Sequence, residues 1–493
     1  MRFRPAALAL ALLALTVTPT ASAAASTGGG HDVVRTDKGL VRGTQSEGLR
    51  VFEGIPFATP PVGDLRWQPP RPARPWHGVR HANEPGSQCA QLAPAYGGAT
   101  TYVEDCLYLN VTTPSTRGKR PVMVWVHGGS NLTGSGGNYD AAKLAGRDVV
   151  VVTVNYRLGV LGWLGTGNQG LLDQQAALRW VRSNARAFGG DPRNVTLFGE
   201  SAGAANTCAN LASPGARGLF HKAIPQSYSC TAPTRTRESA TADVQALMTA
   251  VNCPDIRCLR AVPAKTLLET SATLGTPAGP VAGTADLPLP PADAIAQGRF
   301  HRMPVMHGNT RDEMRLFVGL SYPTGLPAAQ YEQLVRTLYP GKDVLSKYPP
   351  GDDPRLALAA IQSDHGTALA TCTHIAAYDL FTRAGVPVYA YQFADRDAPP
   401  LIDMPNYDEG AEHATELTYL WRDLLGPLTP QQEQLSTTMA RYWTTFAHTG
   451  QPNAPHTPKW PRYRSPADVQ NLSPGEVKPV DAAQRANCAF WAT

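Results

Sequence analysis

Short apolar runs recur along the chain and alternate with segments that have the apolar spacing of helices. The runs are nearly continuous and rich in Val, and they cover residues 122–126, 149–154, 195–198, 304–306 and 386–393. Such runs are typical of strands that are buried on both faces, as in a parallel sheet covered by helices. The pattern therefore predicts a mostly parallel central sheet.

One intervening segment, residues 174–188, shows a clear helical pattern. Ala177, Leu178, Val181 and Ala185 follow helical spacing, and Gly189 and Gly190 then supply a helix C-terminal signal. Strands that alternate with helices indicate an α/β fold with helices on both faces of the sheet. Because we find no repeat and no charged or Pro-rich linker inside 32–493, we interpret these residues as a single α/β domain with long loops.

The N-terminal residues have the pattern of a secretory signal. Arg2 and Arg4 precede a 10-residue apolar run at 6–15, and the small residues Ala21, Ser22 and Ala23 follow it. A membrane-spanning helix needs about 20 apolar residues, so this run is too short to span a bilayer. We therefore expect a signal peptide at 1–23, a flexible N-terminus at 24–31, and a secreted, extracellular protein without a membrane span.

Charge and cysteine content limit the partners of the chain. Lys and Arg number 44 against 39 Asp and Glu, which gives a net charge of only +5 and does not favour nucleic acid or an anionic membrane as a partner. The 8 cysteines form an even set in a chain expected to be exported. Outside the cell such cysteines favour disulfides over metal ligands, but the residues alone leave the pairing open.

The most informative motif is Gly199-Glu200-Ser201-Ala202-Gly203, a G-x-S-x-G sequence. An apolar strand-like run precedes it and small, helix-compatible residues follow it. This strand, turn and helix arrangement is typical of a nucleophile elbow, in which the serine hydroxyl is exposed above the sheet. The alternative interpretation is an ordinary glycine-rich turn between a strand and a helix.

A serine nucleophile requires amide donors for the oxyanion of its transition state. His127-Gly128-Gly129-Ser130 follows the strand-like run 122–126, so the amides of Gly129 and Ser130, together with that of Ala202, would form an oxyanion hole. His127 itself precedes the nucleophile, whereas this fold supplies its catalytic residues in the order Ser, acid, His. We therefore assign His127 a structural role.

The acid and the base are expected downstream of Ser201. Asp312 and Glu313 follow the apolar run 304–306, and both qualify as the acid on chemical grounds, although a surface salt bridge with a neighbouring arginine is the alternative for either. His413 follows the run 386–393 and is the best candidate for the base, because it has the required position in the chain order.

Taken together, these segments resemble the type-B carboxylesterase and cholinesterase family of α/β-hydrolases, and especially its bacterial para-nitrobenzyl-esterase-like members. The similarity extends along the whole chain after the leader. The matching segments are FEGIPFA (52–58), PPVGDLR (60–66), EDCLYLN (104–110), FGGDP (188–192) and CAFW (488–491).

The resemblance implies an α/β-hydrolase fold whose long loops form an active-site gorge, and it implies a role for each candidate residue. Ser201 would be the nucleophile, Glu313 rather than Asp312 the acid, and His413 the base. The implied oxyanion donors are Gly129, Ser130 and Ala202. The implied disulfides are Cys89–Cys106, Cys253–Cys258 and Cys372–Cys488, with Cys208–Cys230 as a candidate fourth, and the implied structural ion pairs are Arg66–Glu104 and Arg157–Asp173.

The chain also departs from the family pattern near the site. Ser130 and Asn131 stand where the family has a third Gly followed by an aromatic residue, and Tyr228 replaces a Gly, so that its ring is expected to crowd the substrate pocket. The Cys89–Cys106 loop has only 16 interior residues and no Trp. This absence argues against the cation recognition of cholinesterases. Tyr96 and Tyr102 on the same loop either line the mouth of the site or are simply exposed.

The sequence thus predicts a secreted serine carboxylesterase that hydrolyses small-molecule carboxylic esters through an acyl-enzyme and needs neither a metal nor a cofactor. One alternative is a non-catalytic binding or adhesion module of the same fold. Another is a lipase, polyester hydrolase or peptidase with the same chemistry. Acyl and alcohol preference and oligomeric state are left open, and a monomer is compatible with the sequence.

Overall fold

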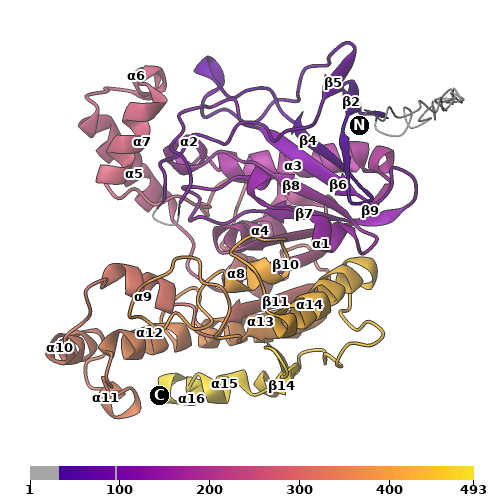
Figure 1. Cartoon of the computed structure of the whole chain (residues 1–493). Helices are drawn as coiled ribbons and strands as arrows, with labels where there is room; N and C mark the ends of the chain where they lie inside the picture. The colour runs from indigo at the N-terminus through magenta and orange to yellow at the C-terminus, as the bar shows by residue number, and fades with distance from the viewer. Residues whose placement is uncertain (1–32, 95–96, 493) are drawn as a thin grey trace, which may run out of the picture. The chain divides into compact units, whose positions relative to one another are not determined.

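The central element is an 11-stranded sheet with the strand order β14-β13-β12-β11-β10-β9-β7-β8-β6-β4-β3 (Figure 1). The computed structural model describes residues 33–94 and 97–492. The expected signal peptide (1–23), the segment 24–31 and Tyr96 lie outside the described residues. The strands are β1 (Val33–Arg35), β2 (Leu40–Arg42), β3 (Thr44–Ser46), β4 (Leu49–Pro56), β5 (Val79–His81), β6 (Tyr108–Thr113), β7 (Arg120–Val126), β8 (Val150–Val154), β9 (Gly190–Glu200), β10 (Lys222–Gln226), β11 (Val305–Thr310), β12 (Val388–Phe393), β13 (Val469–Leu472) and β14 (Lys478–Val480).

The strands from β8 to β13 pair in parallel, and antiparallel strands flank them. β3, β4 and β6 extend the sheet beyond β8, and β14 extends it beyond β13. All five apolar runs of the sequence are strands of the parallel part, which confirms the predicted α/β fold. The antiparallel strands and the parallel strands β10 and β13 were not predicted, because their more mixed residues carry a weaker pattern.

Both faces of the central strands are buried, as the continuous apolar runs predict. On β7, Val122, Val124 and Val126 belong to one hydrophobic core, whereas Met123 and Trp125 belong to another. Side chains of α3, α4 and α13 complete the first core, and side chains of α1 and α14 complete the second. Successive strand residues point to opposite faces, so a strand between two helical layers needs apolar residues at every position.

The α-helices of the described chain all follow β7 and lie between residues 142 and 492. They are α1 (Ala142–Ala145), α2 (Gly159–Trp163), α3 (Gln169–Asn184), α4 (Ala202–Ala212), α5 (Arg237–Ala250), α6 (Ile256–Ala261), α7 (Ala264–Thr273), α8 (Pro291–Ala296), α9 (Arg315–Ser321), α10 (Ala328–Leu338), α11 (Val344–Lys347), α12 (Pro354–Asp364), α13 (Thr371–Arg383), α14 (Pro430–Thr449), α15 (Ala482–Arg485) and α16 (Cys488–Ala492). None of those in the described ranges combines the length and apolarity that crossing a membrane requires.

The helix predicted at 174–188 differs from α3 at both ends. α3 begins five residues earlier, at Gln169, and its last turn, Ala185–Phe188, is a 3₁₀ helix that ends at Gly189 with a φ of 77°. The early start was missed because a glycine at 170 and a charge at Asp173 weaken the local helical signal. Tertiary contacts compensate, because the Asp173 carboxylate accepts hydrogen bonds from Arg157.

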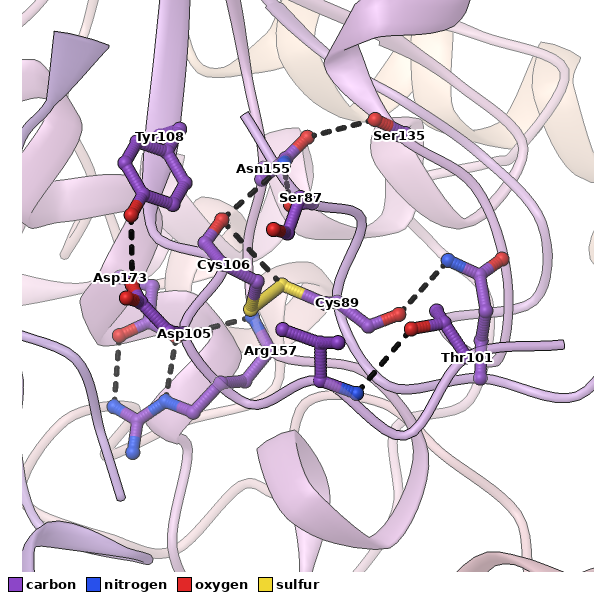
Figure 2. Close-up of a disulfide and its surroundings, with 12 residues drawn as sticks. Ser87, Cys89, Thr101, Asp105, Cys106, Tyr108, Ser135, Asn155, Arg157 and Asp173 are labelled. Carbon is purple, nitrogen blue, oxygen red and sulfur yellow. Dashed lines mark hydrogen bonds and ion pairs between the residues drawn. A yellow bond between two sulfur atoms is a disulfide. The ribbon is translucent and has the colours of Figure 1, made fainter. Parts of the chain in front are cut away.

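The eight cysteines form four disulfides: Cys89–Cys106, Cys208–Cys230, Cys253–Cys258 and Cys372–Cys488. Figure 2 shows the surroundings of the first. The side-chain amide of Asn155 donates to the Cys106 carbonyl at 3.1 Å and to the Ser87 carbonyl at 3.0 Å. Nearby, the Arg157 guanidinium contacts both carboxylate oxygens of Asp173 at 2.7 Å (Figure 2). The ion pair between Arg66 and Glu104 is also present, so both implied pairs are confirmed.

Candidate active site

Ser201 occupies a sharp turn between the end of β9 and the start of α4. Its backbone has a φ of 55° and a ψ of −123°, a strained conformation for a residue with a side chain. The flanking glycines permit the turn. A Cβ on Gly203 would lie 2.0 Å from the Val126 carbonyl oxygen, and a Cβ on Gly199 would lie 2.6 Å from the same oxygen. The turn therefore has the form of the nucleophile elbow that the sequence predicts.

Glu313 and His413 come from separate loops and meet in a buried hydrogen bond. The His413 Nδ1 lies 2.6 Å from Glu313 Oε2. The other carboxylate oxygen, Oε1, accepts the backbone N–H of Thr310 at the end of β11, at 2.8 Å. Glu313 is completely buried, and the Phe317 ring packs on the imidazole with a centroid distance of 5.2 Å. Glu313 thus sets the orientation of the ring and directs its Nε2 away from the carboxylate.

The third contact of the imidazole is with Glu200 rather than with the serine. The His413 Nε2 lies 3.1 Å from Glu200 Oε1, but this oxygen has no hydrogen-bond partner among the described residues. Both Ser201 and His413 are described, and no hydrogen bond joins their side chains. They do line the same cavity. Sequence reasoning did not assign a function to Glu200, although its place in the motif, directly before Ser201, was a signal.

Burial and charge act in opposite directions on the ionisable groups around His413. Burial raises the pKa of the Glu200 carboxyl above its usual value, whereas the neighbouring imidazolium lowers it. Glu416 is also buried, and its pKa is raised by burial and by the nearby carboxylates of Glu200 and Glu313. Burial lowers the pKa of the His413 imidazole, but the attraction of Glu200 and Glu313 outweighs that effect, and the pKa rises above its usual value. His413 therefore titrates as part of a cluster of carboxyl groups.

Backbone N–H groups suitable for an oxyanion lie beside Ser201. Within the described ranges, the N–H groups of Gly129, Ser130 and Ala202 make no hydrogen bond. The Gly129 carbonyl accepts the N–H groups of Leu132 and Thr133 at 2.9 and 3.0 Å, and these bonds close the loop. A Cβ on Gly128 would lie 3.1 Å from the Ser201 Cβ, so this loop packs directly on the elbow.

Two cavities meet at Ser201. One has a volume of about 590 Å³ and is lined by His413, Glu200 and apolar side chains including Leu401 and Leu425. The other has a volume of about 310 Å³, and its wall includes Tyr228 and the Cys208–Cys230 disulfide. Ser130, Ser201 and Phe317 line both cavities. Cavities of about 300 to 1,000 Å³ are typical of small-molecule sites.

The other candidates of the sequence have structural partners. His127 is 1% exposed, stacks on Tyr156 at 4.5 Å, and has a pKa lowered to about 4 by burial. Asp312 accepts hydrogen bonds from Arg396 at 2.7 and 2.8 Å, so it takes the salt-bridge role while Glu313 contacts the imidazole. Tyr102 is exposed and its hydroxyl donates to Glu269 at 3.2 Å.

Metal-ligating side chains do not cluster in the part of the chain that the structure describes. There, no group of three or more His, Cys, Asp or Glu is arranged to hold a metal ion.

The geometry agrees with the comparisons with known proteins. The model of the carboxylesterase family matches residues 30–491. The chain belongs to this family. It is 36% identical to the para-nitrobenzyl esterase of Bacillus subtilis (strain 168) over 484 residues, which cover 88% of this chain and 93% of the relative. It is 32% identical to carboxylesterase 3 of Pongo abelii, over 90% of this chain and 87% of the relative.

Solved structures of family members have the same fold. A carboxylesterase of Geobacillus stearothermophilus at pH 6.2 aligns with a TM-score of 0.81 and 34% identity, covering 93% of this chain and 100% of the other. A PNB esterase aligns with a TM-score of 0.78 and 33% identity, covering 93% and 99%. The predicted α/β-hydrolase fold and the predicted activity class are confirmed: the protein is a serine carboxylic-ester hydrolase.

Proposed function

We propose that the protein is a secreted carboxylesterase in which Ser201 is the nucleophile, His413 the base and Glu313 the acid. The observation that carries the proposal is the buried 2.6 Å contact between Glu313 and His413, in a cavity that Ser201 also lines. Catalytic hydrogen bonds are often long or absent in a free enzyme and form in the complex with substrate. We accordingly expect His413 to hydrogen-bond to Ser201 when an ester is bound.

The reaction follows from these positions. His413 takes the proton of Ser201 as the oxygen attacks the ester carbonyl, and the N–H groups of Gly129, Ser130 and Ala202 stabilise the negative charge on the carbonyl oxygen. His413 then donates its proton to the leaving alcohol. Water, activated by the same imidazole, hydrolyses the acyl-enzyme and restores the hydroxyl of Ser201. None of these steps requires a metal or an organic cofactor.

The position of the proton donor also indicates which cavity binds the alcohol half of the ester and which binds the acyl half. The leaving oxygen must lie beside the imidazole that protonates it, so the alcohol group occupies the cavity of about 590 Å³ that His413 lines. The acyl group then enters the cavity of about 310 Å³ beside Tyr228. Esters with a bulky alcohol and a shorter acyl group are the substrates that we expect.

The proposal places the catalytic domain at 32–493 and the enzyme outside the cell. The four disulfides support this location, because disulfides persist in oxidising compartments. The pattern of residues 1–23 supports it independently.

Labelling and kinetics with a single variant test the triad. Replacement of Ser201 by Ala is expected to lower kcat for p-nitrophenyl acetate by about 10⁴- to 10⁶-fold, and to abolish covalent labelling by a fluorophosphonate probe. Ser229→Ala is the matched control, because Ser229 lines the same acyl cavity but its hydroxyl already donates to the Thr373 carbonyl. Parental turnover and labelling in the Ser201→Ala variant would refute the proposal and favour a non-catalytic role for this serine.

A further inference from the structure

Position 130 combines a strained backbone with a side chain that has no structural role in the described chain. The φ of Ser130 is 56°, a conformation that glycine adopts at little cost and that a residue with a Cβ adopts at a penalty. The neighbouring Gly129 also has a positive φ, of 88°. Ser130 keeps a Cβ and a hydroxyl at such a position, which calls for a compensating function.

The loop around Ser130 is held firmly in place. The Asn131 carbonyl accepts the N–H of Gly159 at 2.7 Å. The Asn131 side-chain oxygen accepts the amide of Asn206, on the elbow helix α4, at 2.8 Å. The loop is therefore bound both to α2 and to the helix that follows the nucleophile. A group on this loop is preorganised relative to Ser201, as electrostatic stabilisation of a transition state requires.

Within this loop the hydroxyl of Ser130 has no partner. Among the described residues it makes no hydrogen bond, whereas the nearby hydroxyl of Ser135 is bonded to Asn155 at 3.1 Å. Ser130 is exposed, and it lines both cavities together with Ser201. The carbonyl carbon of a bound ester lies at the junction of those cavities, because its acyl half enters one and its alcohol half the other.

We propose that the Ser130 hydroxyl is an additional oxyanion donor, which adds a side-chain hydrogen bond to those of the backbone amides. This inference rests on the proposed function, since it requires a tetrahedral intermediate on Ser201. The hydroxyl donates its hydrogen to the carbonyl oxygen as negative charge develops there, and no covalent bond to Ser130 forms. A serine hydroxyl is a suitable donor to an oxyanion, because its hydrogen bond to a charged acceptor is stronger than one to a neutral acceptor. Ser130 is then a catalytic residue through its side chain as well as its backbone.

Two variants separate the effect of the Ser130 hydroxyl from that of its strained backbone. Ser130→Ala keeps the Cβ and the strained backbone and removes only the hydroxyl. Ser130→Gly removes the hydroxyl and the strain together. We expect both variants to lower kcat/KM for p-nitrophenyl acetate by about 10- to 100-fold through kcat, somewhat less than loss of a principal donor, because the three amides remain. KM should change by no more than about twofold.

A transition-state analogue shows whether the hydroxyl acts on the oxyanion. A trifluoromethyl ketone forms a hemiketal with the nucleophile, and its oxygen occupies the oxyanion hole. Its inhibition constant should rise in Ser130→Ala by the same factor as kcat/KM falls. Fluorophosphonate titration counts the active sites, and thermal unfolding confirms the fold, with Ser130→Gly melting at or above the parental Tm.

The outcomes distinguish this inference from the proposed function. If Ser201→Ala is inactive while both Ser130 variants keep parental kcat/KM, the inference is wrong and the triad stands. A loss of activity without a matching rise in the inhibition constant also overturns it, because the hydroxyl then acts elsewhere. Parental activity in Ser201→Ala removes the proposed function itself, whatever the Ser130 variants show.

Discussion

The two cavities that meet at Ser201 differ in the chemistry of their walls as well as in volume. The larger contains His413 and the carboxyl group of Glu200, whereas the smaller contains Tyr228 and a disulfide but neither His413 nor Glu200. One nucleophile thus serves two unlike compartments. Under the proposed mechanism, the position of the proton donor, rather than cavity size, decides which half of an ester each cavity receives.

Removal of the proton donor has the largest expected effect, because it removes the main chemical difference between the two cavities. His413→Gln replaces the imidazole by a group that cannot accept the proton of Ser201, so kcat for p-nitrophenyl acetate should fall by about 10⁴-fold or more. Glu313→Gln should lower kcat by about 10³- to 10⁴-fold, because the amide no longer stabilises the imidazolium. Steady-state kinetics on fluorophosphonate-titrated enzyme measures both losses. A His413→Gln enzyme within tenfold of the parent would show that the base lies elsewhere.

A change in the smaller cavity tests whether this cavity binds the acyl half of the ester. Tyr228→Gly removes a half-buried ring from the wall of this cavity, so longer acyl chains should fit. We expect the kcat/KM ratio of p-nitrophenyl decanoate to p-nitrophenyl acetate to rise by about 10-fold or more. The ratio of 1-naphthyl to methyl acetate, which differ only in the alcohol, should stay within about twofold.

Leu425→Trp is the matched change in the larger cavity. It should alter the alcohol ratio and leave the acyl ratio unchanged, because Leu425 lines only the His413 side of Ser201. If the two variants exchange their effects, the acyl and alcohol compartments are assigned in reverse.

The smallest expected effect concerns pH. Negative charge on Glu200 raises the pKa of the His413 imidazole, and in the proposed mechanism the neutral imidazole is the base. Activity is therefore lost as the pH falls through this raised pKa. Glu200→Gln removes the charge, so the acidic limb of the kcat/KM profile should move to lower pH. A limb that stays in place in this variant would mean that Glu200 is already neutral in the range where the enzyme titrates.

Prediction from the sequence worked where the signal is local. Five of the seven parallel strands in the described chain were predicted, because burial on both faces requires apolar residues at successive positions, as on β7. The elbow was predicted from the G-x-S-x-G motif between a strand-like run and helix-compatible residues, and in the structure only glycine fits at Gly199 and Gly203 beside the Val126 carbonyl. Both depend on a few neighbouring residues.

Prediction failed where the deciding contact joins distant segments. Asp312 and Glu313 are neighbours of similar chemistry, and the residues alone did not separate them. The turn after β11 directs Asp312 to Arg396 and Glu313 to His413. The contact between Glu200 and His413 likewise has no local signature.

By itself, the sequence determined the α/β character, the nucleophile motif and the family pattern, because each is recorded in residue types at short spacing. The tertiary structure alone decided the contacts of the imidazole and the division of the site into two cavities. These features arise where loops from separate strands converge above the sheet. Their geometry depends on the packing of the whole domain, which no single stretch of residues specifies.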